Sequence, residues 1–123
     1  MNDGAIKYLL LEDEYYTALS IKMMIAKARP HYVLAGECES AKDAVSLIAS
    51  THPDLIISSV ILCDGISLNT LRSCHIPVII FTGFPNFREL YQLPNLVDYV
   101  LKPISEHDVA TSLSKFEKSL LTT

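Results

Sequence analysis

Five polar side chains follow the ends of short apolar segments that lie far apart in the chain. They are Glu12, Asp13, Ser59, Thr82 and Lys102. Two neighbouring carboxylates can hold a hard divalent cation such as magnesium through their oxygens. A hydroxyl and an ammonium group nearby suit a phosphoryl group. If the fold brings these residues together, they predict a pocket for magnesium and phosphate chemistry.

The apolar segments have the length and composition of buried strands, and amphipathic stretches separate them. We predict strands at 6–11, 33–38, 55–59, 78–81 and 97–101. Helices are expected at 15–29, 41–50, 66–74 and 84–92, with a last one after Ser105. This alternation predicts an α/β fold with one doubly wound, five-stranded parallel sheet in the order 2-1-3-4-5, the flavodoxin-like architecture. The carboxyl ends of parallel strands share one edge, so the five polar residues should converge there.

Two helix starts have clear capping signals. Ser40 precedes the second helix with Asp43 three residues on, and Ser105 precedes the last helix with Asp108 in the same relation. The last helix should bury an apolar stripe. Its members are Val109, Leu113, Phe116 and Leu120.

Composition narrows the class of protein. The 123 residues suit one domain spanning 1–123, and the net charge of −4 argues against direct binding to nucleic acid. No apolar run approaches the roughly 20 residues that cross a membrane, and the first residues do not resemble a secretory signal. The three cysteines form no metal-binding spacing and are expected to be free thiols of a cytoplasmic protein.

Taken together, five motifs resemble the receiver domain of two-component response regulators over essentially the whole chain. They are Leu-Leu-Glu-Asp-Glu at 10–14, Pro-Asp-Leu-Ile-Ile at 53–57, Asp-Gly at 64–65, Phe-Thr-Gly at 81–83 and Asp-Tyr-Val-Leu-Lys-Pro at 98–103. The resemblance implies that Glu12 and Asp13 help to bind magnesium. It also implies that Thr82 and Lys102 contact the phosphoryl oxygens.

The same resemblance implies a switch and a contact surface. Tyr99 would be the aromatic residue that reorients on activation, and a cis peptide bond between Lys102 and Pro103 would aim the lysine into the site. The partner would be a sensor kinase or another signalling protein. A homodimer through the fourth helix, fifth strand and fifth helix is also implied, with Tyr91 and Tyr99 in that surface.

One departure from the family pattern bears on function. The phosphoacceptor aspartate of the family falls six residues after the proline that opens the third strand, and here that position is Ser59. A serine hydroxyl needs a base, and the matching residues show none. Ser59 also brings no charge to a cation, so magnesium binding should be weakened. We expect Lys102 to pair with Asp13 alone and to hold one conformation without phosphorylation.

The sequence therefore favours a non-enzymatic receiver-like signalling module that is not phosphorylated at the usual position and acts through protein–protein contacts. One alternative is a receiver that accepts the phosphoryl group on Asp64 or Ser59. Another is a flavodoxin-like binder of a nucleotide or flavin, although the acidic residues after the first strand disfavour a phosphate there.

Overall fold

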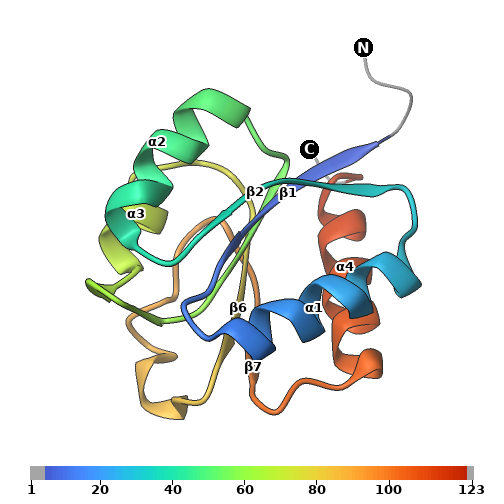
Figure 1. Cartoon of the computed structure of the whole chain (residues 1–123). Coiled ribbons are helices and arrows are strands. Elements are labelled where there is room, and N and C mark those ends of the chain that lie inside the picture. Colours follow the sequence, from blue (N-terminus) through green and yellow to red (C-terminus); the bar gives the residue numbers. More distant parts are fainter. Residues whose placement is uncertain (1–4, 122–123) are drawn as a thin grey trace.

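A five-stranded parallel sheet runs through the centre of the molecule (Figure 1). The computed structural model describes residues 5–121. The strands are β1 (Ile6–Leu11), β2 (Tyr32–Cys38), β3 (Leu55–Ser58), β6 (Val78–Thr82) and β7 (Leu96–Leu101). They are ordered β2-β1-β3-β6-β7, which confirms the predicted doubly wound order of the five main strands.

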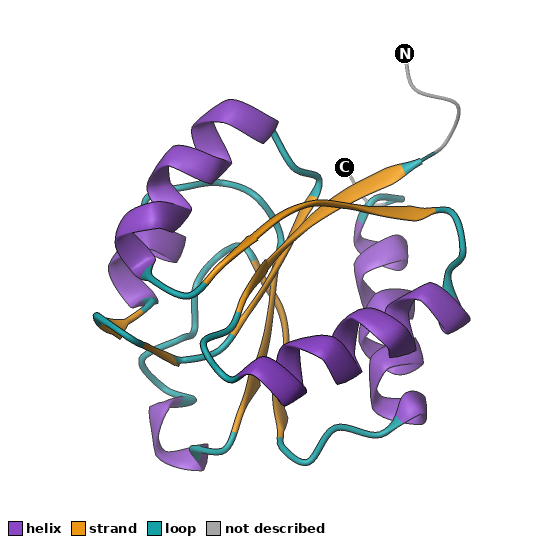
Figure 2. Cartoon of the chain, in the orientation of Figure 1, coloured by secondary structure: helices purple, strands orange, loops and turns teal. Residues whose placement is uncertain are grey.

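The helices cover both faces of this sheet, in the layered arrangement visible in Figure 2. Helices α1 (Tyr15–Ala28) and α4 (Glu106–Ser119) pack on one face, and α2 (Ala41–Thr51) and α3 (Leu68–Arg72) lie on the other. Each central strand sends alternate side chains into the two apolar clusters, as the period of two along a strand requires. The described helices include none long and apolar enough to cross a membrane.

Both predicted helix caps are present. The Ser40 hydroxyl accepts a hydrogen bond from the Asp43 backbone at 3.0 Å. Ser105 and Asp108 form a reciprocal capping box, with both bonds at 3.0 Å. These bonds satisfy backbone donors that have no partner within the helix, and they fix where α2 and α4 begin.

The structure corrects two of the predicted helices. The stretch 66–74 forms a helix only at Leu68–Arg72, and it follows a small antiparallel pair, β4 (Ile61–Leu62) with β5 (Gly65–Ile66). The stretch 84–92 contains a single 3₁₀ turn, η1 (Pro85–Phe87), and no α-helix. Pro85 and Pro94 bracket too few residues for a stable helix, since isolated short helices are marginal.

The predicted stripe of α4 is wrong at its last member. Val109, Leu113 and Phe116 are buried, but Leu120 lies beyond the end of the helix and is 46% exposed. The predicted domain span of 1–123 also includes residues 1–4 and 122–123, which lie outside the described part of the chain.

Candidate functional site

Strand register brings all five predicted site residues to one edge of the sheet. Leu11 of β1 lies beside Ser58 of β3, and Thr82 of β6 lies beside Leu101 of β7. The residues that follow these positions therefore emerge together. They line a cavity of about 200 Å³, formed by Glu12, Asp13, Glu14, Ser59, Ile61, Thr82, Gly83, Phe84 and Lys102.

Glu12, Ser59 and Lys102 form a closed cluster of hydrogen bonds at the base of this cavity. The Ser59 hydroxyl donates to Glu12 Oε1 at 2.6 Å, and Lys102 Nζ donates to the same oxygen at 2.8 Å. Lys102 Nζ also lies 3.1 Å from Ser59 Oγ. The Glu12 side chain is only 3% exposed, so its charge is compensated inside the protein by the lysine.

This cluster corrects two expectations from the sequence. Lys102 pairs with Glu12, whereas Asp13, the partner that we predicted, is exposed. The Glu12 carboxylate also lies beside the Ser59 hydroxyl as a proton acceptor, whereas the sequence suggested no base for this serine. The chain turns Glu12 inward because Glu12 Oε2 accepts a bond from the Glu14 backbone at 3.1 Å.

The third acidic residue, Glu14, has a structural role. It is the N-cap of α1, and its carboxylate accepts a 3.0 Å hydrogen bond from the Thr17 backbone. This bond lowers the pKa of Glu14. The three consecutive acidic residues thus have different positions: Glu12 is buried and paired, Asp13 is exposed, and Glu14 caps a helix.

Thr82 and Tyr99 are joined through the backbone of Phe84. Thr82 Oγ1 accepts a hydrogen bond from the Phe84 backbone N–H at 3.1 Å, and the Tyr99 hydroxyl donates to the Phe84 carbonyl oxygen. Tyr99 is buried, and burial raises its pKa. The Arg88 guanidinium lies over its ring, 4.7 Å from the centroid, a contact that the sequence did not predict.

The Lys102–Pro103 peptide bond is cis, the isomer that the resemblance implied. Tyr91, by contrast, does not lie where the predicted contact surface would need it. Its side chain is fully buried, and Tyr99 is 4% exposed, so neither presents its ring at the surface.

Asp64 lies outside this cavity and caps another helix. Its two carboxylate oxygens accept hydrogen bonds from the backbone N–H groups of Ala41 and Lys42, at 2.8 and 3.1 Å. These bonds lower its pKa. Asp64 therefore stabilises the first turn of α2, and its geometry does not support a role as substitute phosphoacceptor.

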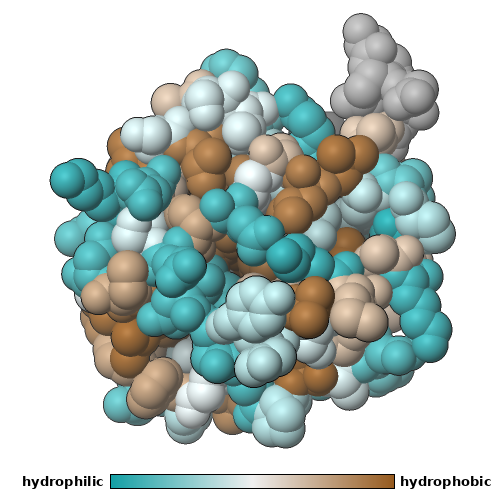
Figure 3. Space-filling view, in the orientation of Figure 1, coloured by the Kyte–Doolittle hydropathy of each residue, from teal (hydrophilic) through white to brown (hydrophobic). Residues whose placement is uncertain are grey.

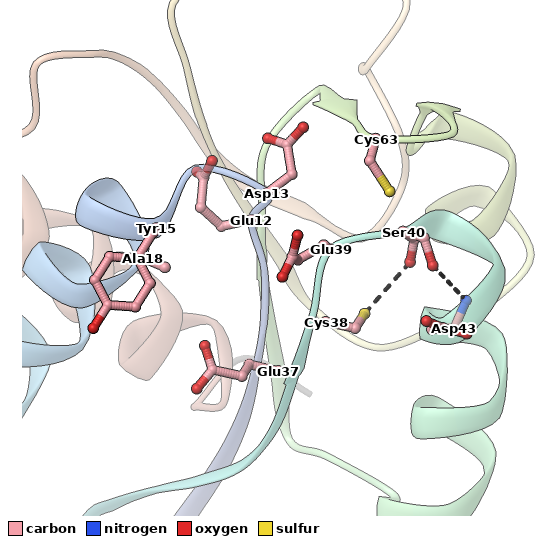
Figure 4. Close-up of a pocket in the computed structure, with 10 residues that line it drawn as sticks. All are labelled: Glu12, Asp13, Tyr15, Ala18, Glu37, Cys38, Glu39, Ser40, Asp43 and Cys63. Atoms are coloured by element: carbon pink, nitrogen blue, oxygen red, sulfur yellow. Dashed lines mark hydrogen bonds between the residues drawn. The ribbon is translucent and has the colours of Figure 1, made fainter.

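A second, larger hollow of about 530 Å³ lies beside the candidate site, between the ends of β1 and β2 and the β4–β5 pair. Figure 4 shows five carboxylates and two thiols around it, from Glu12, Asp13, Glu37, Glu39, Asp43, Cys38 and Cys63. Burial is the main cause that raises the pKa of the half-buried Cys38 thiol. Cys63 is exposed, and its pKa is raised by partial desolvation and by nearby carboxylates, first that of Asp64. No group of three or more His, Cys, Asp or Glu side chains within residues 5–121 has a geometry that could hold a metal ion.

The sheet order and the cluster of Glu12, Ser59, Thr82 and Lys102 at its carboxyl edge define a receiver domain. The chain is a receiver domain homologous to those of response regulators. No protein-family model matches it. It is 33% identical over 128 residues to a protein-glutamate methylesterase/protein-glutamine glutaminase of Methanosarcina mazei, matching 97% of this chain and 34% of that protein.

Two further relatives bear on the assignment. The response regulator protein VraR of Staphylococcus epidermidis is 30% identical over 118 residues, covering 90% of this chain and 56% of that protein. The solution structure of the receiver domain of the Erythrobacter litoralis response regulator PhyR superposes with a TM-score of 0.77 at 26% identity, covering 94% of this chain and 92% of that domain. The chain thus spans only 34% and 56% of the two curated relatives.

Proposed function

We propose that this receiver domain signals through protein–protein contacts without accepting a phosphoryl group, and that it is not an enzyme. The observation behind this proposal is the Glu12–Ser59–Lys102 cluster. Ser59 stands where the family pattern places the acceptor aspartate, and Glu12 supplies the negative charge that faces Lys102. Because the Glu12 carboxylate already compensates the charge of Lys102, no phosphoryl group is needed to hold the lysine in place.

The residues present do not fit a tight magnesium site. Glu12 is engaged with Lys102, and Ser59 offers a neutral oxygen, which leaves exposed Asp13 as the uncommitted member of the acidic pair. Hard divalent cations depend on several charged oxygen ligands, so we expect weak binding at most.

One observation favours a second candidate, a receiver that accepts the phosphoryl group on Ser59. The Ser59 hydroxyl donates to Glu12 at 2.6 Å, the arrangement of a nucleophile beside a base. However, the same Glu12 oxygen also accepts from Lys102, and a carboxylate paired with an ammonium group is a weak base towards a hydroxyl. We therefore favour a receiver domain that signals without accepting a phosphoryl group.

Intact mass spectrometry after incubation with acetyl phosphate and magnesium tests this proposal. We expect no adduct on the wild type and an acid-labile adduct on Ser59→Asp, because the variant restores the missing carboxylate opposite Lys102. An acid-labile adduct on the wild type would overturn the proposal, and an acid-stable one mapped to Ser59 would establish the second candidate. A Ser59→Asp variant that stays unmodified would show that more than the acceptor is missing.

The contact surface that we propose for a signalling partner lies on α1. The homodimer implied by the resemblance, through the segment 84–92, β7 and α4, stays a prediction. Tyr15, Tyr16 and Met23 are 71%, 73% and 63% exposed, and Leu19 lies between them at helical spacing. Figure 3 shows pale and brown side chains over α1, bordered by hydrophilic ones. A sensor kinase or another cytoplasmic signalling protein is the partner that we expect to dock there, and the acidic hollow beside Tyr15 favours one with a basic flank.

Substitution of two exposed side chains of α1 tests this surface. Tyr16→Ser combined with Met23→Ser should change the free energy of unfolding by less than about 0.5 kcal/mol, because both side chains are exposed. In the source organism, the transcript profile of this double variant should match that of a deletion strain. Val45→Ser, on the exposed side of α2, is the matched control and should behave as wild type. A double variant with a wild-type profile would exclude α1 as the contact surface.

A further inference from the structure

Ser59 joins two hydrogen-bond systems that lie on opposite sides of it. Its hydroxyl belongs to the cluster with Glu12 and Lys102. Its carbonyl oxygen accepts two other hydroxyls, from Ser58 at 2.7 Å and from Ser67 at 2.8 Å. A carbonyl oxygen has two lone pairs, so this acceptor is fully used, and its position depends on the residues that donate to it.

Ser67 uses its hydroxyl for a distant contact. It occupies the N-cap position of α3, where a serine ordinarily caps the helix, but its side chain forms no capping bond. The single hydroxyl proton of Ser67 goes to the Ser59 carbonyl oxygen. In the 2.9 Å contact between Ser67 Oγ and Tyr91 Oη, the Tyr91 hydroxyl must therefore be the donor. Ser67 and Tyr91 are fully buried, so the chain of bonds runs through the interior.

Tyr91 in turn anchors the segment 84–93, which has few strong bonds of its own. Within it, the backbone bonds to Pro85, Phe87 and Glu89 are 3.2–3.3 Å long, and one short bond, at 2.8 Å, joins the Leu93 N–H to the Tyr91 carbonyl at the end of the segment. At its start the segment is tied to Thr82 and Tyr99 through Phe84. Near its end, Tyr91 supplies the tie to Ser67. A segment with weak internal bonding takes its conformation from such anchors.

We propose that the buried chain Tyr91–Ser67–Ser59 carbonyl transmits the state of the Glu12–Ser59–Lys102 cluster to the segment 84–93. A shift of the Ser59 backbone lengthens the bond from Ser67 and leaves buried hydroxyls without good acceptors. Tyr91 Oη also lies 3.4 Å from the carbonyl oxygen of Val60, a longer contact than its 2.9 Å bond to Ser67. Because unsatisfied buried hydroxyls are costly, Tyr91 and its segment must adjust. This coupling goes beyond the proposed function, since it holds whether or not Ser59 accepts a phosphoryl group.

Native-state amide exchange of the segment 84–93 tests the coupling in three variants: Ser59→Ala, Tyr91→Phe and the double variant. Each single change should raise exchange in the segment by about fivefold, the effect of one net hydrogen bond. The double variant should exchange no faster than the faster single variant, because both changes break the same chain. Exchange in α4 reports the change in global stability and should rise by no more than exchange in the segment.

The matched control is Tyr32→Phe, which removes a hydroxyl bonded to Glu117, away from this chain. It should leave exchange in 84–93 unchanged and should not alter the effect of Ser59→Ala. Ser67→Ala is a second probe and should reproduce the effect of Tyr91→Phe. Unchanged exchange in 84–93 after Ser59→Ala would overturn the inference. The fold increases in exchange caused by Ser59→Ala and Tyr91→Phe could instead multiply in the double variant. That result would also overturn the inference, because the two sites would then act independently.

Discussion

At the scale of single residues, the site is defined by which carboxylate meets Lys102. Glu12 and Asp13 are adjacent in sequence, but only Glu12 turns into the cavity and reaches the lysine at 2.8 Å. The longer side chain and the hydrogen bond that the Glu14 backbone N–H donates to Glu12 Oε2 favour this arrangement. The buried charge of Glu12 is thereby paired, as buried charges must be.

Removal of this charge should destabilise the protein. We expect Glu12→Gln to lower the free energy of unfolding by about 1–2 kcal/mol, less than for a fully buried pair because Lys102 can still reach solvent. Asp13→Asn is the matched control, with an expected change within about 0.5 kcal/mol. Urea unfolding measures both, and a larger loss in Asp13→Asn than in Glu12→Gln would contradict the observed pairing.

The sequence predicted which residues reach the site better than it predicted how they pair. Strand ends set the edge where Ser59, Thr82 and Lys102 emerge, and the apolar pattern indicates where strands end. Pairing depends on side-chain direction within the folded site, which periodicity does not encode. For the same reason, nothing in the pattern distinguished the buried bond of Ser67 from an ordinary helix cap.

At the scale of elements, the helices with strong capping and apolar patterns were predictable. Helices α1, α2 and α4 begin where the sequence indicated, because caps and amphipathic stripes are local signals. The segment 84–93 was not predictable, since its conformation comes from distant anchors at Thr82, Tyr99 and Ser67. Tertiary contacts there outweigh local propensity.

An ion pair at the other end of the sheet gives a prediction about pH. Arg29, at the end of α1, donates to Glu117 of α4 at 2.7 Å, and Tyr32 of β2 also donates to this carboxylate. The Arg29 hydrogen bond is the main cause that lowers the pKa of Glu117 below its ordinary value of 4.5. A lowered folded-state pKa gives stability that is present above the ordinary value and is lost as pH falls through the lowered one.

We therefore expect Glu117→Gln to reduce the free energy of unfolding by about 0.5–1 kcal/mol at neutral pH, since the pair is partly exposed. The difference in the free energy of unfolding between wild type and Glu117→Gln should shrink as the pH falls below 4.5, the ordinary pKa of a glutamate. Urea unfolding across a pH series checks this. Glu106→Gln, whose pair with Lys27 is more exposed, is the control and should have a smaller effect. A difference that grows towards acid would contradict the assignment.

At the scale of the whole molecule, the two faces of the sheet have different roles. The face covered by α1 and α4 presents the exposed aromatic side chains of α1, whereas the other face holds the buried chain from Ser59 to Tyr91. The candidate site lies at the edge between them. The site is therefore adjacent to both faces, which suits a domain that signals by contact.

Calorimetric titration of the wild type and of Ser59→Asp with magnesium measures whether the pocket lacks a charged ligand at position 59. We expect Ser59→Asp to bind magnesium at least about tenfold more tightly than the wild type, because the variant restores a charged oxygen ligand where Glu12 is engaged with Lys102. Wild-type binding as tight as that of Ser59→Asp would contradict this expectation, since the cavity would then be a complete magnesium site without an acceptor carboxylate.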